Sequence, residues 1–135
     1  MDINALKSKV AQDDTPVTIP IYQKDGDPYL AADGTPATID VVGSESKRYK
    51  AARTKITKNM LRSRRVRVEP EDLQRNRIAM AAAAVTGWHG WENGNEPLAC
   101  TEENIAMLLG IEHVLEQVEA GISAHTDFFK QSSSS

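Results

Sequence analysis

The chain has 135 residues, a formal net charge of −3 and one cysteine, and 40% of its residues are hydrophobic. These values are typical of one globular domain with a single core, and no apolar run approaches the roughly 20 residues of a membrane-spanning helix. One cysteine excludes an internal disulfide, and it lies too far from the three histidines in sequence for the usual metal-ligand spacings. The first residues mix charged and apolar side chains, unlike a signal peptide. We therefore expect no metal, no cofactor and no membrane partner.

The positive and negative charges are separated along the chain. Residues 47–67 contain no acid and ten of the 16 basic residues, namely Lys47, Arg48, Lys50, Arg53, Lys55, Lys58, Arg62, Arg64, Arg65 and Arg67. From Glu92 to Asp127 there are eight acids and neither Lys nor Arg. This separation predicts a cationic surface and an acidic surface, each suited to a partner of the opposite charge.

The composition along the chain predicts one α+β domain that is mainly α. Residues 1–14 are expected to be a flexible N-terminal arm, in which Ile3, Leu6 and Val10 recur at helical spacing. Residues 15–131 are expected to fold into four to five helices with a small N-terminal antiparallel β-hairpin or three-stranded sheet. The serines at 132–135 cannot bury apolar surface and are expected to be disordered.

Alternating apolar side chains predict the two strands of a hairpin, at residues 17–22 and 37–42. Pro20 has no backbone N–H, so the first strand should lie at an edge. The turn segments KDGDP and ADGTP follow, each with a glycine that is free to adopt a positive φ. Between them, Tyr29-Leu30 can add a short further rung to the sheet.

A basic helix is predicted over residues 46–67. Gly43 ends the preceding strand, and either Ser44 or Ser46 can cap the helix by accepting a hydrogen bond from a free N–H group. The cations cover most of its surface. The remaining apolar stripe contains Tyr49, Ala52, Ile56 and Met60.

Three further segments follow the basic helix. An alanine-rich helix should begin at Pro70 and end near Val85, with Gly87 as its stop and a glycine-rich loop after it. Thr101 should cap a short helix that Gly110 ends. The last helix has the clearest pattern, with apolar residues at Ile111, Val114, Leu115, Val118 and Ile122 and acids at Glu112, Glu116 and Glu119.

The loop of residues 86–100 holds the residues most suggestive of chemistry. His89 and Cys100 could form a nucleophilic pair, but they are eleven residues apart and have no orienting third group or nucleophile motif. We expect no catalytic residues and no enzyme activity. Trp88 and Trp91 are expected to pack onto the core, with exposure at a protein interface as the alternative for both and Trp91 as the residue to test for it.

The cationic segment has three interpretations: a protein partner or self-assembly, a solvated surface, or a nucleic-acid backbone. In self-assembly, the cations of one copy meet the acids of the last helix in the next copy. Such contact joins unlike surfaces and gives a head-to-tail ring or a spiral. Acids elsewhere would repel nucleic acid, and no base-reading motif is present. The predicted protein-interaction residues are Lys55, Lys58, Arg62, Arg65, Trp91, Glu112, Glu116 and Glu119.

Four of these predicted elements follow one another in a distinctive order. The end of the hairpin and the basic helix have the sequences DGTPATIDVVGSES and SKRYKAARTKITKNMLRSRR. The end of the alanine-rich helix with the loop after it, and the end of the chain, have the sequences AVTGWHGWENGNEPLACTEEN and LEQVEAGISAHTDFF. In this order and spacing, over roughly residues 16–130, the chain resembles the tail assembly chaperones of long-tailed, lambda-like bacteriophages (siphoviruses). The most specific elements are the Gly87-Trp88 step, the turn of residues 93–97 and the late Phe128-Phe129 pair.

The resemblance implies a non-enzymatic protein of the host cytoplasm that is absent from the finished virion. Such chaperones coat the long tape-measure protein, keep it soluble and help to recruit major tail (tube) protein subunits. Many have a longer form made by ribosomal frameshifting, and Asp127-Phe128-Phe129 permits a slippery codon run. The implied partners are the tape-measure protein, the tube protein and further copies of the chain, with no nucleic acid. A small nucleic-acid-binding protein that uses residues 46–67 is the alternative.

Overall fold

The computed structural model describes residues 2, 3, 14–63 and 69–132, with side chains up to His125 and excluding that of Ser63. The predicted arm helix from residue 4 onward, the cations Arg64, Arg65 and Arg67, and the last three serines therefore lie outside the described residues. The elements are β1 (Val17–Pro20), β2 (Thr38–Val41), α2 (Lys47–Ser63), α3 (Pro70–Ala84), β3 (Val85–His89), β4 (Glu92–Asn93), β5 (Glu96–Pro97), α4 (Glu102–Leu109) and α5 (Glu112–Ser132). Four helices and a small antiparallel sheet confirm the predicted fold class, α+β and mainly α.

The three-stranded sheet has the order β1-β2-β3, and both strand pairs are antiparallel. β1 lies at an edge, as Pro20 predicts. The segment after it forms isolated bridges, from Tyr22 to Pro28 and from Leu30 to Pro36, so the chain around Tyr29-Leu30 does add to the pairing. Glycines in the two turns have positive φ, at Gly26 (96°) and Gly34 (85°), as predicted.

The third strand corrects the prediction of a loop from residue 86 onward. Helix α3 ends at Ala84, and β3 begins at the next residue and pairs with β2. Val85, Thr86 and Trp88 are β-branched or aromatic residues, which fit a pleated sheet. Gly87 is therefore a strand residue rather than a helix stop. A Cβ there would lie 3.1 Å from Oδ2 of Asp40, so a side chain would crowd the neighbouring strand.

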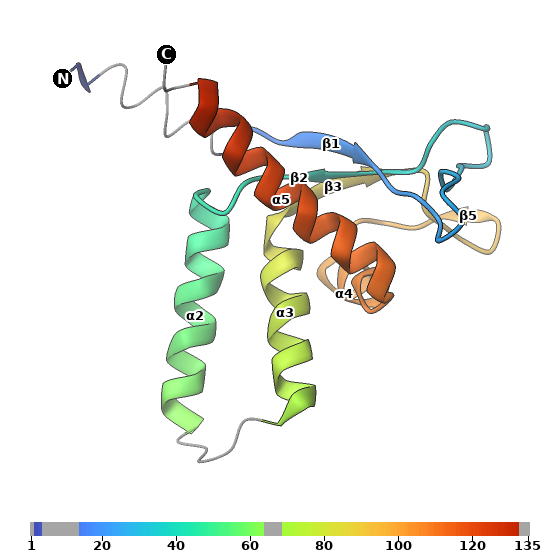
Figure 1. The fold of residues 1–135 in the computed structure, drawn as a ribbon. Helices are drawn as coiled ribbons and strands as arrows, with labels where there is room; N and C mark the ends of the chain where they lie inside the picture. The colour runs from blue at the N-terminus through green and yellow to red at the C-terminus, as the bar shows by residue number, and fades with distance from the viewer. Residues whose placement is uncertain (1, 4–13, 64–68, 133–135) are drawn as a thin grey trace.

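Helix α5 crosses one face of the sheet and encloses the core between itself, β2 and α4 (Figure 1). Gly121 allows this close approach, because a Cβ on it would lie 2.7 Å from Cδ1 of Ile19 in β1. The apolar residues predicted for the last helix, Val114, Leu115, Val118 and Ile122, are buried there, whereas Ile111 precedes the helix and is 46% exposed. Thr101 caps α4 by accepting a hydrogen bond from the N–H of Asn104 (3.2 Å), as predicted.

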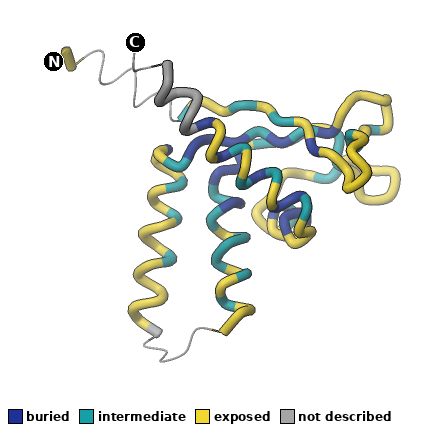
Figure 2. The backbone as a smooth tube through the Cα atoms, in the orientation of Figure 1, coloured by how far each residue is buried: buried dark blue, intermediate teal, exposed yellow. Residues whose placement is uncertain are grey.

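Helices α2 and α3 form a hairpin that extends away from the sheet (Figure 1). The cap of α2 is Ser46, whose hydroxyl accepts from the N–H of Tyr49 (3.3 Å) and donates to the carbonyl of Gly43 (2.7 Å). Between Lys47 and Arg62 no residue is buried, and only Tyr49, Ala52 and Ile56 are partly covered. Figure 2 shows this exposure along almost the whole of α2. Within the described ranges, no helix has the length and apolar character to cross a membrane.

Candidate protein-interaction surface

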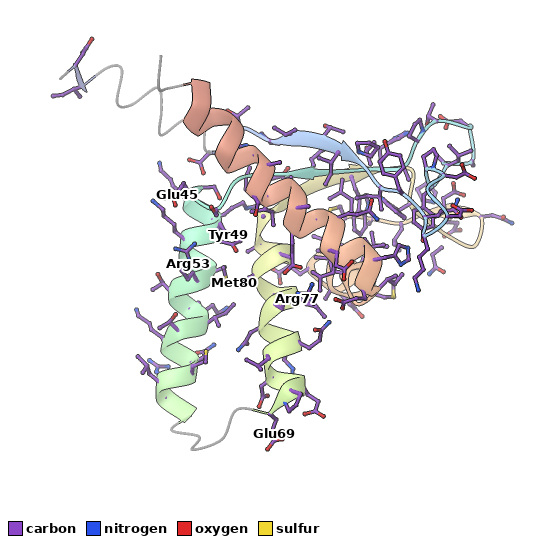
Figure 3. The ribbon with its side chains drawn as sticks, in the orientation of Figure 1. Glu45, Tyr49, Arg53, Glu69, Arg77 and Met80 are labelled. Atoms are coloured by element: carbon purple, nitrogen blue, oxygen red, sulfur yellow. The ribbon has the colours of Figure 1, made fainter. Side chains whose placement is uncertain are left out.

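The cations in the first turns of α2 contact other residues of the same chain. Arg48 donates a hydrogen bond to the backbone at the start of β3 (3.2 Å), and Lys50 pairs with Glu45 (3.1 Å). The guanidinium of Arg53 lies over the ring of Tyr49, 5.4 Å from its centroid (Figure 3). The Arg48 contact attaches the start of the hairpin to β3, and the three contacts together leave these cations partly engaged within the chain.

The outer half of α2 carries the cations that were predicted to bind a partner. Lys55, Lys58 and Arg62 are exposed, and none of their side chains forms an ion pair or hydrogen bond with the rest of the described chain. Arg65, predicted with them, lies outside the described residues. Exposed apolar side chains accompany these cations, because Met60 is 47% exposed and Leu61 is 73% exposed. The outer half of α2 is thus both cationic and apolar.

A groove lies between α2, α3 and α4, and we call it the interhelix groove. Its volume is about 520 Å³, and its apolar lining includes Ala52 and Ile56 of α2, Ala79 and Ala82 of α3, and Ile105 of α4. An adjoining hollow of about 650 Å³ runs along α3 and shares Ala79 and Ala82 with it. The alanines of α3 are too small to fill the space between the helices, so an apolar surface stays open.

The acids predicted on the last helix are divided between two environments. Arg77 of α3 donates to Glu112 (2.7 Å) and, through two nitrogens, to Glu119 (2.6 and 2.9 Å). These hydrogen bonds, first the one with Glu119, raise the pKa of Arg77 above its ordinary range. Hydrogen bonding from Arg77 lowers the pKa of the Glu112 carboxyl. Glu116 is exposed, and its interaction role, like that of Glu112 and Glu119, stays a prediction.

Two further exposed acids lie in α4. Glu102 and Glu103 occupy the first turn of that helix, where the positive end of the helix dipole favours them. Two apolar side chains of the same region are exposed, Met107 at 59% and Ile111 at 46%. The region of α4 and the start of α5 therefore combines acids with apolar surface, as the outer half of α2 combines cations with apolar surface.

Both tryptophans are held against the core, as predicted. The indole N–H of Trp88 donates to the carbonyl of Leu98 (2.8 Å), and that of Trp91 donates to the carbonyl of Thr38 (3.0 Å). The Trp91 ring also lies 5.6 Å from the ring of Tyr29, measured between centroids. Both side chains pack against the core while part of their surface stays exposed. An interface role for Trp91 stays a prediction.

The two residues considered for nucleophilic chemistry have separate environments. His89 lies 3.1 Å from the hydroxyl of Thr35, measured from Nε2 to Oγ1. Burial first, and then the charge of Asp40, raises the pKa of the Cys100 thiol, which lowers the thiolate fraction at neutral pH. In the described ranges there is no group of three or more His, Cys, Asp or Glu residues that could hold a metal ion.

Two features of this surface could not be found from the predicted site residues. One is the pairing of Arg77 with Glu112 and Glu119, whose only signal in sequence is that the two acids lie seven residues apart on one helix face. The other is the interhelix groove, because its shape depends on how α2 and α3 diverge. The alanine run of α3 was consistent with close packing but equally with helix propensity alone.

Comparison of the chain with protein-family models, with curated proteins and with solved structures gave no match.

Proposed function

We propose that this protein is a non-enzymatic tail assembly chaperone of a long-tailed bacteriophage. In this role it self-associates, coats the tape-measure protein in the host cytoplasm, keeps it soluble and helps to recruit tube subunits through a longer, frameshifted form. It is absent from the finished virion. The order of sequence segments that resembles this family supports the proposal, together with one observation on the fold.

That observation is the position of the two oppositely charged surfaces on different parts of the molecule. The outer half of α2 carries exposed cations, while α4 and the start of α5 carry exposed acids. Lys55 and Glu102 both line the interhelix groove, whereas Lys58 and Arg62 of α2, and Glu103 and Glu116 of the acidic region, lie outside its lining. Contact between the α2 surface of one copy and the acidic surface of the next joins unlike surfaces. Each copy then leaves one surface of each kind free, so association continues along a chain of copies. A long client needs such a repeating coat.

The alternative of a nucleic-acid-binding protein is favoured by Lys55, Lys58 and Arg62, whose charges are not neutralised within the described chain. Cations at this density can bind a phosphate backbone. The same helix, however, exposes Met60 and Leu61 beside those cations, and apolar side chains add nothing to phosphate binding. The mixed surface favours a protein partner.

The first test is the mass of the protein in solution, measured by light scattering over a range of concentrations. At low salt we expect the mass to rise with concentration beyond that of one chain, and we expect high salt to reduce it. The double variant Lys58→Glu/Arg62→Glu should lose this association, and so should Glu103→Lys/Glu116→Lys. An equimolar mixture of the two variants should associate again, because each supplies the charge that the other lacks.

The second test is the solubility of a phage tape-measure protein co-expressed with this chain. We expect the intact chain to keep the tape-measure protein soluble and the two charge-reversed variants to do so poorly. A protein that stays monomeric at high concentration and low salt, and that leaves the tape-measure protein insoluble, would contradict the proposal. Saturable micromolar binding of random duplex or single strands in a gel shift would instead support the nucleic-acid alternative.

A further inference from the structure

The interhelix groove has the shape of a receptor for a helix. Its floor consists of small and apolar side chains, with Ala79 and Ala82 from α3 and Ile56 from α2. Alanines let the backbone of a neighbouring helix come close, as in natural helix packing. Along α3 the groove and its adjoining hollow extend from Pro70 to Ala83, which corresponds to about 20 Å or roughly four helical turns.

The wall of the groove that α2 provides is cationic in a regular pattern. Arg48 and Lys55 line the groove, and Arg62 follows on the same face of the helix, so cations recur every seven residues. Arg75 of α3 adds a further cation, while among the described residues Glu102 is the one acid that lines the groove and Glu71 the one that lines the adjoining hollow. Charges at seven-residue spacing beside an apolar seam are the arrangement by which paired helices select partners of opposite charge.

We infer that the interhelix groove binds an amphipathic helix of another protein, with an apolar stripe that faces the alanines and with acids along the edge that faces α2. The inference rests on the proposed function, because it names the class of client segment that the chaperone covers. Recognition of this kind places the apolar face of a helix in a groove and uses flanking charges for orientation and specificity.

The observations favour another protein over a second copy of this chain. The acidic helices of the chain itself, α4 and α5, already bury their apolar sides in their own core, at Ile105, Leu109, Leu115 and Val118. Neither helix can place that side in the groove of another copy without unfolding. A nucleic acid is disfavoured because no aromatic side chain, on which a base could stack, is among the described residues lining the groove.

The test uses two synthetic helical peptides of about 18 residues, a length of roughly 27 Å that covers the groove. Both carry leucine and alanine along one face, with glutamate on the flanks of the first peptide and lysine at the same positions of the second. Fluorescence anisotropy with the intact protein should show saturable binding of the glutamate peptide. The lysine peptide should bind at least tenfold more weakly. Equal binding of the two peptides, or no binding of either, would overturn the inference.

A matched pair of variants places the binding in the groove. Ala79→Glu puts a negative charge on the groove floor at an exposed position, and Ala51→Glu puts the same charge on an exposed position of α2 outside the groove. We expect the first variant to weaken binding of the glutamate peptide at least tenfold and the second to change it less than twofold. Similar effects of both variants would place the peptide elsewhere and overturn the inference.

The two proposals fail in different ways. If the intact protein does not bind the glutamate peptide, and the intact protein and Ala79→Glu keep the tape-measure protein soluble equally well, the groove inference fails and the chaperone function stands. If the peptide binds in the groove but the tape-measure protein stays insoluble and the chain stays monomeric, the chaperone function fails. The preference of the groove for acidic helices would then still hold.

Discussion

The packed body of the molecule and the helical hairpin that extends from it differ in how far their apolar side chains are buried. In the body, side chains such as Ile39 and Leu115 have no exposed surface, and α5, α4, the sheet and the end of α3 share one core. In the outer hairpin, Leu61 is 73% exposed and Leu73 is 58% exposed, with cations around them. The body therefore supplies the stability of the fold, whereas the hairpin keeps its apolar surface available for a partner.

The two regions are joined by contacts at the base of the hairpin, where α2 begins and the second half of α3 packs against the core. They include the Ser46 cap, the hydrogen bond from Arg48 to β3 and the pairing of Arg77 with α5. Only the last residues of α3 are fully covered, at Ala81 and Ala84. The hairpin is consequently attached at one end and exposed at the other, and its outer half should contribute little to the free energy of unfolding.

The largest contrast is expected between two leucine-to-alanine variants. Leu115→Ala leaves a cavity among fully buried side chains and should lower the free energy of unfolding by about 2–5 kcal/mol. Leu61→Ala, on the exposed outer half of α2, should change it by no more than about 0.5 kcal/mol. Urea denaturation of both variants measures the difference. A comparable loss in Leu61→Ala would mean that the hairpin is part of the stabilising core, and the contrast between the regions would be wrong.

The body was also the region that the sequence predicted best. The apolar positions of the last helix recur at helical spacing, and Val114, Leu115 and Val118 are buried as expected. Local signals also identified Thr101 as the cap of α4 and, in the hairpin, offered Ser46 beside Ser44 as the cap of α2, because a cap depends on residues within one turn of it. These features need no knowledge of distant parts of the chain.

The features that the sequence missed all depend on residues far apart in the chain. β3 exists because Val85–His89 finds a partner in β2, more than forty residues earlier. Arg77 meets Glu119 across 42 positions, and the groove depends on the packing of three separate helices. Glycines at Gly87 and Gly90 suggested a loop, but pairing with β2 outweighed that local preference. For the same reason the cations could be identified from the sequence, whereas the groove beside them could not.

Loss of the pairing of Arg77 with its two acids should lower the stability of the fold less than Leu115→Ala does. Arg77→Met removes the charged hydrogen bonds to Glu112 and Glu119 and leaves their mutual repulsion uncompensated. We expect a measurable loss of thermal stability and weaker protection of α3 from hydrogen exchange. Arg75→Met is the matched control, since Arg75 is largely exposed and lies 3.7 Å from Asp72. Equal effects of the two variants would contradict the role given to Arg77.

The stabilisation that the pairing of Arg77 with Glu112 provides should depend on pH. The folded-state pKa of Glu112 lies below its ordinary value of 4.5, so its pairing with Arg77 stabilises the fold above that pH. This stabilisation should be lost as the pH falls below 4.5 through the lowered pKa. Melting temperatures measured between about pH 7 and pH 3 should therefore fall less steeply for Arg77→Met than for the unchanged protein. Parallel curves would show that Arg77 does not lower the pKa of Glu112 in the folded protein.

The smallest effect, and the most selective, is expected at the cap of α2. Ser46→Ala removes the acceptor for the Tyr49 N–H and the donor to the Gly43 carbonyl, at a fully buried position, and should cost about 1 kcal/mol. If the hairpin is attached mainly at this end, the loss should appear as faster hydrogen exchange along α2 with little change in α5. Thr101→Ala, which removes the cap of α4 in the body, should instead affect α4 and leave α2 unchanged. Uniformly faster exchange in Ser46→Ala would show that the hairpin and the body open together, because only a shared unfolding reaction couples helices that have so few contacts in common.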